Sequence, residues 1–562
     1  MVSIWMTVFV VAYLVIIGYL GFRGYRGTQS ATDYMLGGRK THPYVMAMSY
    51  GATFISTSAI IGFGGAAAVF GMSLLWLPFL NIFLGIFIAF WLFGGRTRRM
   101  GLRLDAHTFP ELLGRRFQSR FIQGAAAVII FLFIPMYASA VLTGAAKYLA
   151  HQFAIDYSAA LFVFSVIIAL YVVMGGIKGV MYTDALQATV MLIGLSALLV
   201  LTYNRLGGVS HAHQMLTDMA GKVPDKLLAA GHQGWTAMPK FGSPLWWVAI
   251  STITMGVGIG VLAQPQLAVR YMTVKSGKEL NRAIPIGGIF ILLTAGVAYI
   301  AGALSNVFFD QTAGKISLAM VGGDVERIIP MYLQKATPEW FSVLFMLTLM
   351  SAAMSTLSSQ FHIMGTSLGR DLVEESLKVK KKGRGVLATR FGVLAGILIS
   401  VCLSYIIELR FGKTGTAIVA RGTAIFFGLC AGAFLPIYIG ALWSRSITRA
   451  GAIAGMLAGA LSSLFWMTFV LEKSSTALLL CQKWFGTRSL AVSMENGAEV
   501  FAKTGPFIWA FVDPIMISLP IAALVTVLVS RFTEKLPDEH LNRCIGPLKT
   551  NKNPKEEAYA GN

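Results

Sequence analysis

Long apolar runs, each about as long as a membrane-spanning helix, recur along the whole chain. A helix needs roughly 20 mostly apolar residues to cross the hydrocarbon core of a bilayer. Thirteen such runs can be read, at residues 4–22, 45–70, 73–94, 121–148, 157–175, 182–203, 245–268, 283–305, 339–367, 390–408, 415–442, 450–471 and 507–530. The pattern predicts an all-α, polytopic membrane protein with about 13 transmembrane helices, embedded in a lipid bilayer.

Charged residues are scarce and gather between these runs. The 562 residues are 56% hydrophobic and 13% charged, and 46 Lys and Arg against 25 Asp and Glu give a net charge of +21. A soluble domain carries about twice that charged share, which disfavours soluble enzymes and disordered proteins. The basic residues, including Arg116 and Arg270, lie in every second loop between the runs. Such basic loops are typical of the cytoplasmic side of a membrane. We therefore expect a prokaryotic inner-membrane protein with its N-terminus outside, its C-terminus cytoplasmic and no nucleic-acid partner.

The sequence carries no motif of covalent or nucleotide chemistry. Its 4 cysteines, Cys402, Cys430, Cys481 and Cys544, are far apart and form no metal-binding or disulfide pattern. It has no HExxH, no phosphate-binding loop and no GxSxG elbow. The chain is therefore predicted not to be an enzyme, and no organic cofactor is expected.

Two runs are unusually rich in Gly, Ser and Thr. Residues 51–65 concentrate all three types, and residues 251–265 contain three glycines at spacing two before Pro265. Both segments have a low helix propensity and are expected to unwind. Matching interruptions in two halves are typical of inverted-repeat transporters, which hold substrate and ion where the backbone leaves the helix. Close helix packing through small residues is the alternative.

The two interrupted runs are five spans apart and divide the chain into two halves. Residues 45–203 form the first predicted repeat and residues 245–442 the second. The other predicted segments are an N-terminal span with its loop at 1–44, an external loop at 204–244, two added spans at 443–530 and a cytoplasmic tail at 531–562.

The ninth run presents a dense face of hydroxyl groups. Ala352, Ser355, Thr356 and Ser359 recur at helical spacing, and Ser358 lies on the adjacent stripe. Such hydroxyls can bond neighbouring helices, at about 0.6 kcal/mol per contact, or bind a hard cation such as sodium, which prefers oxygen ligands. Unwinding of the second run would free two further carbonyls. The resulting ligand set is Ala52, Ile55, Ala352, Ser355 and Thr356.

Asp184 is an ionisable residue at the start of the sixth run. Ionisable groups inside a membrane mark functional sites by default, although an aspartate at a helix N-terminus also serves as a cap. The two roles are compatible, because this end of the run is the cytoplasmic one, where a released cation would pass.

Several short motifs, in their order and spacing, resemble the sodium:solute symporter family, whose members share the leucine-transporter-type 5+5 inverted-repeat fold. The resemblance covers the first to the eleventh run and the thirteenth. The motifs are Asp33-Tyr-Met-Leu-Gly-Gly-Arg39, residues 51–65, Thr108-Phe-Pro-Glu-Leu-Leu113, Tyr182-Thr-Asp184, Gln264-Pro265 with Arg270-Tyr-Met272, Met354-Ser-Thr-Leu-Ser358, and Phe511-Val-Asp-Pro514.

The resemblance implies that Na+ is the coupling ion and that its first site is the same set of five residues. Some members bind a second sodium through an aspartate and three serines. The matching residues here are Asp184, Ser355, Ser358 and Ser359, so a second sodium site or an exit path is expected there.

At the positions where the family binds substrate, this chain lacks the residues typical of proline carriers and of sugar carriers. Proline carriers place a tryptophan and a tyrosine where this chain has Val257 and Val261, and an aspartate where it has Phe54. Sugar carriers have an asparagine at the position of Phe54 and a glutamine at that of Ala59. The pocket is therefore expected to be small and apolar and to suit a short aliphatic chain. Residues 360–370 resemble the monocarboxylate permeases of the family.

A carboxylate substrate also needs hydrogen-bond donors. The candidates are the backbone amides near Ser56 and Gln264, the hydroxyl of Thr57 and the guanidinium of Arg421. We therefore predict a sodium-coupled symporter that imports a small organic solute, a short monocarboxylate first of all, by alternating access. The alternatives are an amino acid such as proline, a vitamin such as pantothenate, or a membrane sensor that binds solute without transporting it.

Overall fold

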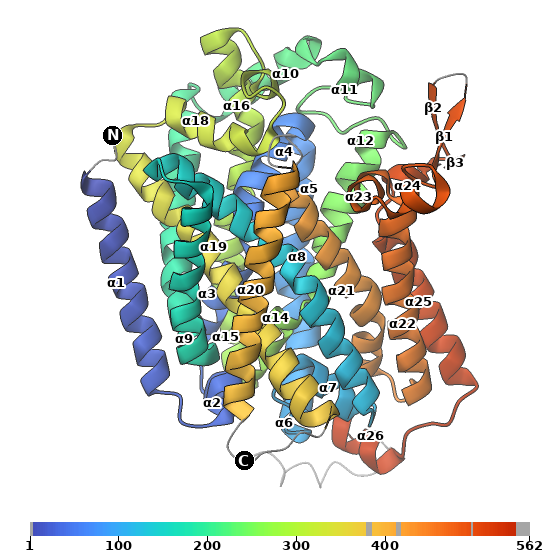
Figure 1. Ribbon diagram of the computed structural model, residues 1–562. Helices are drawn as coiled ribbons and strands as arrows, with labels where there is room; N and C mark the ends of the chain where they lie inside the picture. Colours follow the sequence, from blue (N-terminus) through green and yellow to red (C-terminus); the bar gives the residue numbers. More distant parts are fainter. Residues whose placement is uncertain (1–3, 378–384, 412–417, 496–497, 547–562) are drawn as a thin grey trace.

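The computed structural model describes residues 4–377, 385–411, 418–495 and 498–546, and it is almost entirely helical. Long helices stand side by side in one bundle, and short helices cover its two ends (Figure 1). Ten helices of the described residues are long and apolar enough to cross a bilayer. Their outer faces expose large hydrophobic side chains, such as Val8 and Val15 of α1 (Ile4–Arg26), as expected of helices that face lipid.

The main helices of the bundle follow one another along the chain. After α1 they are α3 (Pro43–Phe54), α4 (Phe63–Phe70), η4 (Asn81–Gly94), α8 (Arg120–Phe153), α9 (Tyr157–Arg205), η6 (Val248–Val257), α15 (Gly277–Thr294), α16 (Val297–Ala313), α19 (Glu339–Thr366), η10 (Ser367–Ser376), α20 (Gly385–Phe411), α21 (Ile418–Trp443), α22 (Arg449–Phe465) and α25 (Ile515–Arg531). Shorter segments join them: η1 (Gly37–Arg39), η2 (Ser58–Gly62), η3 (Gly71–Leu75), α5 (Trp76–Leu80), α12 (Pro244–Trp247), α13 (Gly258–Gly260), η7 (Val261–Ala263), α14 (Pro265–Ala268), η8 (Val269–Met272) and η11 (Trp466–Val470).

The two ends of the bundle carry different elements (Figure 1). We call one the basic end, after the arginines of its helices; it carries α2 (Ala31–Leu36), α6 (Gly95–Arg103), α7 (Phe109–Arg116) and α26 (Asp538–Ile545). The opposite end carries α10 (Val209–Asp218), η5 (Met219–Lys222), α11 (Asp225–Ala229), α17 (Ser317–Met320), η9 (Val325–Arg327), α18 (Ile328–Ala336), α23 (Glu472–Leu478) and α24 (Leu480–Phe485). Also near this end, β1 (Val492–Glu495) pairs antiparallel with β2 (Ala498–Phe501), β3 (Lys503–Thr504) pairs antiparallel with β4 (Phe507–Ile508), and η12 (Trp509–Phe511) precedes α25.

Helix α9 contains a reversal of the chain at Gly176. The backbone there has φ +57° and ψ −161°, outside helical geometry. Tyr171 donates a hydrogen bond to the carbonyl of Met354, and Ser358, one turn further along α19, donates to Asp184. The stretch of α9 between these two contacts would rise about 20 Å if it were straight, far more than one turn of α19. α9 therefore comprises two segments that run in opposite directions.

The backbone leaves helical geometry in both runs that are rich in Gly, Ser and Thr. α3 ends at Phe54, Ile55 is extended with φ −86° and ψ 100°, and the chain resumes as η2. In the seventh run Gln264 is extended with φ −69° and ψ 117°, and Pro265 begins α14. Proline lacks an amide hydrogen and therefore suits the first position of a new helical segment.

Arg116 lies in the connection between the third and fourth runs, as the sequence-based count has it, but there it belongs to a helix and is buried. It is the last residue of α7 and is fully buried, and its guanidinium donates to the carbonyls of Ala441 at 3.0 Å and Ser444 at 2.7 Å. These carbonyls end α21, where no further helical amide follows. The arginine therefore caps a helix C-terminus, where a positive charge is favourable.

Gly176→Ala is expected to destabilise the protein. A Cβ at Gly176 would lie 2.7 Å from the ring of Tyr34, and its positive φ disfavours any L side chain. We expect a loss of about 1–3 kcal/mol, seen as a lower unfolding temperature in detergent. Gly18→Ala is the matched control, because its Cβ would meet nothing within 4 Å. Equal unfolding temperatures for the two variants would contradict the role of Gly176.

Candidate functional site

The C-terminal end of α3 meets the hydroxyl face of α19. Ser355 Oγ donates to Ala52 O at 2.9 Å and to Ala352 O at 3.3 Å, and Thr356 Oγ1 donates to Thr53 O at 3.1 Å. All of these residues are buried. Because α3 stops here, its last carbonyls have no helical amide to accept from. The hydroxyls of α19 take the place of the missing helical donors.

The oxygens at this junction form a donor set that suits a hard cation. Hydroxyl and carbonyl oxygens are the ligands that such cations prefer, and the C-terminal end of a helix carries a partial negative charge. Of the residues predicted for the first sodium site, Ala52, Ala352 and Ser355 are in contact, while Thr356 turns to the carbonyl of Thr53. Ile55, the fifth predicted ligand, lines the neighbouring cavity.

Asp184 and Arg270 form an ion pair in the interior of the bundle. Arg270 Nη2 lies 3.0 Å from Asp184 Oδ2, and the two side chains are 1% and 0% exposed. Ser49 Oγ donates to the same carboxylate oxygen at 2.7 Å, and Ser358 Oγ donates to the other oxygen at 3.2 Å. Buried charges are tolerated when they are paired and their remaining hydrogen-bonding capacity is used. The surrounding serines meet this requirement for Asp184.

The guanidinium of Arg270 connects the ion pair to the hydroxyl face of α19. It donates to Thr53 Oγ1 and to Ser359 Oγ at 2.6 Å each, and these two hydroxyls are 2.9 Å apart. The carbonyl of Thr53 also accepts from Thr356. Thr53 therefore belongs both to the surroundings of the ion pair and to the end of α3, where the first sodium site is predicted.

Arg270 is a buried residue of η8, so its assignment to a basic loop is wrong. An aspartate within an apolar run implies a nearby countercharge, and this signal was available at Asp184. The partner could not be identified from spacing, because it lies 86 residues away along the chain. Asp184 itself lies inside the second segment of α9 and does not cap its N-terminus.

The serines predicted for a second sodium site do not all contact Asp184. Ser358 contacts the carboxylate of Asp184, Ser359 contacts the guanidinium of Arg270, and Ser355 is directed toward the end of α3. Arg270 already supplies the positive charge that the carboxylate requires. In this arrangement Arg270 occupies Oδ2 of Asp184, and Oδ1 accepts from Ser358.

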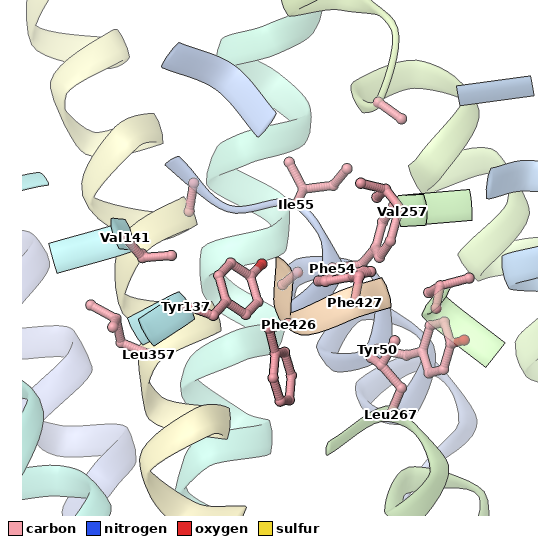
Figure 2. Packing of buried hydrophobic residues seen from close by; sticks show 14 of the residues in the cluster. Tyr50, Phe54, Ile55, Tyr137, Val141, Val257, Leu267, Leu357, Phe426 and Phe427 are labelled. Carbon is pink, nitrogen blue, oxygen red and sulfur yellow. The ribbon is translucent and has the colours of Figure 1, made fainter. Parts of the chain in front are cut away.

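A small cavity lies beside the interruption that follows α3. It is lined by Phe54, Ile55, Ser56, Ala59, Phe63, Asn81, Tyr137, Val257, Ala295, Tyr299 and Phe427. Four residues predicted to contact substrate are among them, namely Phe54, Ser56, Ala59 and Val257. Figure 2 shows how Phe54, Val257 and Phe427 gather around the same space. Among the described residues, the wall is mainly aromatic and aliphatic and has no Asp, Glu, Lys, Arg or His.

The sequence-based prediction missed six cavity residues, Phe63, Asn81, Tyr137, Ala295, Tyr299 and Phe427. The ring centroids of Tyr137 and Phe427 are 5.5 Å apart. Asn81 is 2% exposed, and its Oδ1 has no hydrogen-bond partner within the described residues. Asn81 could have been noticed as an amide in an apolar run, whereas membrane tyrosines are equally typical of interfacial belts.

The other predicted substrate residues lie outside the cavity wall or outside the described side chains. Thr57 Oγ1 donates to Val141 O at 3.2 Å, toward α8. Val261 faces η4, and Gln264 is fully buried with no hydrogen-bond partner for its amide nitrogen within the described residues. The side chain of Arg421 lies outside the described residues.

Similar proteins are found by sequence and by structure. The chain is 27% identical over 468 residues to the osmoregulated proline transporter OpuE of Bacillus subtilis, covering 82% of this chain and 89% of that protein. It is 27% identical over 456 residues to the sodium/proline symporter of Escherichia coli, covering 80% and 85%. A Na+-coupled sialic acid symporter in a substrate-bound, outward-open state has the same fold, with a TM-score of 0.71, 15% identity and coverage of 95% and 99%.

The family model of the sodium:solute symporter family matches residues 34–459, well over half of the chain. Its members are sodium-coupled transporters of small solutes and not enzymes, which agrees with the apolar helices of the bundle. Na+ is thus the coupling ion that the family implies, and a lipid bilayer is the surroundings that these helices require. On this match, the chain belongs to the sodium:solute symporter family.

Proposed function

We propose that the protein imports a small organic solute together with sodium by alternating access. The observation that carries this proposal is the 2.9 Å contact between Ser355 Oγ and Ala52 O, which joins the hydroxyl face of α19 to the uncapped end of α3. Sodium would bind between the two helices, with Ala52, Ile55, Ala352, Ser355 and Thr356 as ligands. It would stabilise the outward-open state by its difference in affinity between the two states.

We place thirteen spans in the membrane and two inverted repeats at residues 45–203 and 245–442. The basic end would face the cytoplasm, because arginine-rich connections are typical of that side. This puts the N-terminus outside and the C-terminal tail inside, in the inner membrane of a prokaryote. The interruptions at Ile55 and Gln264 would then be the broken helices of the two repeats, at corresponding depths.

Proline is the first substrate candidate. The Bacillus and Escherichia relatives are named for proline, and the aromatic wall of the cavity suits the pyrrolidine ring. The unpartnered Oδ1 of Asn81 would accept a hydrogen bond from the ring amine, whereas acetate and propionate carry no donor at neutral pH. The relatives lend no support to the short monocarboxylate that the apolar positions suggested.

The two ends of a proline molecule would be held by different parts of the cavity. Its carboxylate would accept from the backbone amides of residues 56–58, where the chain resumes a helical course. Its amine would face Asn81, with the hydroxyls of Tyr137 and Tyr299 nearby. Because Val257 replaces the tryptophan of proline carriers, recognition would depend on these three residues.

The Asp184–Arg270 pair would act when sodium leaves its first site. A carboxylate in the low-dielectric interior must remain neutralised. Sodium moving toward Asp184 would displace Arg270 from Oδ2, and the guanidinium would remain bonded to Thr53 and Ser359. The carboxylate of Asp184 would thus be neutralised by one cation or the other at each stage, and the displaced guanidinium would keep its hydroxyl acceptors.

Ser355→Ala combined with Thr356→Ala should abolish sodium-driven proline uptake, because it removes the two hydroxyls that donate to the last carbonyls of α3. Membrane insertion should be unaffected. Uptake is measured in proteoliposomes with a sodium gradient or a choline gradient at fixed pH. Thr366→Ala is the matched control, since it removes a buried hydroxyl of α19 that donates to Ile363 of its own helix. If the double variant kept the sodium dependence of the wild type, the site assignment would be rejected.

Proline with sodium should raise the unfolding temperature, and acetate, lactate and pantothenate should raise it less. Asn81→Leu should weaken proline affinity by roughly tenfold, because the amine loses its acceptor at a cost of about 1–3 kcal/mol. Sodium affinity measured without solute should be unchanged, which serves as the internal control. Stabilisation by acetate and not by proline would contradict the proposed substrate.

Counterflow of labelled proline in proteoliposomes separates a transporter from a sensor that only binds solute. A transporter accumulates label against unlabelled proline inside the vesicle, because exchange requires passage through the protein. We expect accumulation. Binding with no counterflow would favour the sensor.

Breaking the ion pair should destabilise the protein. Asp184→Asn leaves the guanidinium of Arg270 buried without its counterion, at a cost of about 3–5 kcal/mol. Asp184→Leu combined with Arg270→Met removes both charges and should recover most of the unfolding temperature without restoring uptake. Wild-type unfolding temperature and wild-type uptake in Asp184→Asn would together contradict the proposed role of the pair.

A further inference from the structure

The motif Asp33-Tyr-Met-Leu-Gly-Gly-Arg39 has no part in the sites described above, yet its tyrosine is completely buried at the basic end. Tyr34 of α2 is 0% exposed, and its hydroxyl donates to the carbonyl of Val173 at 3.2 Å. Its ring occupies the space left by the missing side chain of Gly176, where a Cβ would lie 2.7 Å from the ring. The reversal in α9 thus forms a socket for this one ring.

The other side of the socket is closed by His362 of α19 and Arg390 of α20. The ring centroids of Tyr34 and His362 are 5.5 Å apart, and the guanidinium of Arg390 lies 5.8 Å from the Tyr34 centroid. His362 follows Ser359 by one helical turn, and Ser359 accepts from Arg270. A single turn of α19 therefore connects the socket of Tyr34 to the Asp184–Arg270 pair.

His362 has an unusual environment for a buried imidazole. It is 2% exposed, and neither ring nitrogen has a hydrogen-bond partner within the described residues. Leaving such a group unpaired is unfavourable. Its unsatisfied nitrogens are accounted for if water or an ion reaches them in another state of the transport cycle. His362 is therefore a buried polar group whose hydrogen-bonding capacity is unused among the described residues.

The attachment of α2 suits a part that moves. The helix has six residues and is capped by Ser30. It is joined to the following segment by Gly37, Gly38 and Arg39, which have φ values of +61°, +68° and +57°. A Cβ at Gly38 would lie 2.6 Å from Asp33 Oδ1, so this turn needs glycine. Beyond the turn lies α3, whose far end carries the carbonyls of the predicted sodium site.

We propose that Tyr34 is the cytoplasmic plug of the ion-release path. With its ring in the socket, the route from Asp184 past His362 is closed. Rotation of α2 about Gly37–Arg39 withdraws the ring and admits water to His362 and then to the ion pair. Because the turn leads into α3, a change at the sodium-binding end of α3 can be passed to the plug. The inference rests on the proposed function and adds the residue that gates the inner side.

The plug can be tested by measuring access to position 362 from the cytoplasmic side. The parent protein carries His362→Cys with Cys402→Ser, because Cys402 is the exposed native cysteine of the described residues. Inside-out vesicles in sodium buffer are treated with a membrane-impermeant methanethiosulfonate that carries a trimethylammonium group. Tyr34→Ala in this parent should raise the labelling rate of the introduced thiol by about tenfold or more, since the closed state loses a whole buried ring.

Two further variants separate a plug from a tyrosine that only anchors α2. Tyr34→Phe keeps the ring in the socket and should label at the parent rate. Gly38→Ala strains the closed turn but leaves the socket intact, and it should also raise labelling. An anchoring tyrosine would lower the unfolding temperature in Tyr34→Ala without changing access. Parent labelling rates in both Tyr34→Ala and Gly38→Ala would overturn the proposal.

The outcome is independent of whether the sodium site is correctly assigned. If the proposed function is wrong, sodium will not raise the unfolding temperature of the wild-type protein. This measurement does not involve Tyr34. Failure of the plug would appear as unchanged labelling in a protein that still responds to sodium. The two results can be obtained on the same preparations.

Discussion

The structure depends on a helix that stops inside the bundle. Where α3 ends, the carbonyls of Ala52 and Thr53 are buried among other helices, so they need hydroxyls or a cation as partners. The next residues, Phe54 and Ile55, line the cavity proposed for the solute. Sodium and solute would therefore act on adjacent residues of one interruption. If one ligand orders this segment, the other ligand would bind with a smaller loss of conformational entropy. This difference would be the coupling free energy between the two sites.

Buried charge is the second constraint, and it links the middle of the bundle to its basic end. Thr53 bonds to Thr356 through its carbonyl and to Arg270 through its hydroxyl, so the end of α3 and the Asp184–Arg270 pair are in direct contact. One turn beyond Ser359, α19 reaches the socket of Tyr34. An ion that leaves its first site would thus pass Ser359 and His362 on one face of α19. In the present structure Ser359 accepts a hydrogen bond from Arg270, and His362 packs against the ring of Tyr34.

Features that depend on one stretch of chain could be predicted from the sequence, and features that depend on neighbouring helices could not. The apolar runs, the weak helix propensity near Ile55 and Gln264, and the hydroxyl spacing of Ser355 and Thr356 are local patterns. The partner of Asp184 is not, because Arg270 reaches it only after the chain has folded back on itself. The same holds for Asn81 and the cavity tyrosines, whose importance comes from the helices beside them. Arg116 lies in the expected connection, but its role as a cap of another helix could not be predicted by counting charges per loop.

Sodium and solute are proposed to bind to the two sides of the interruption that follows α3. The most direct test is the equilibrium affinity of the purified protein for proline in sodium and in choline, together with its affinity for 22Na+ with and without proline. We expect each ligand to raise the affinity for the other by the same factor, about 5- to 150-fold. Proline affinity that is the same in sodium and in choline would contradict this coupling.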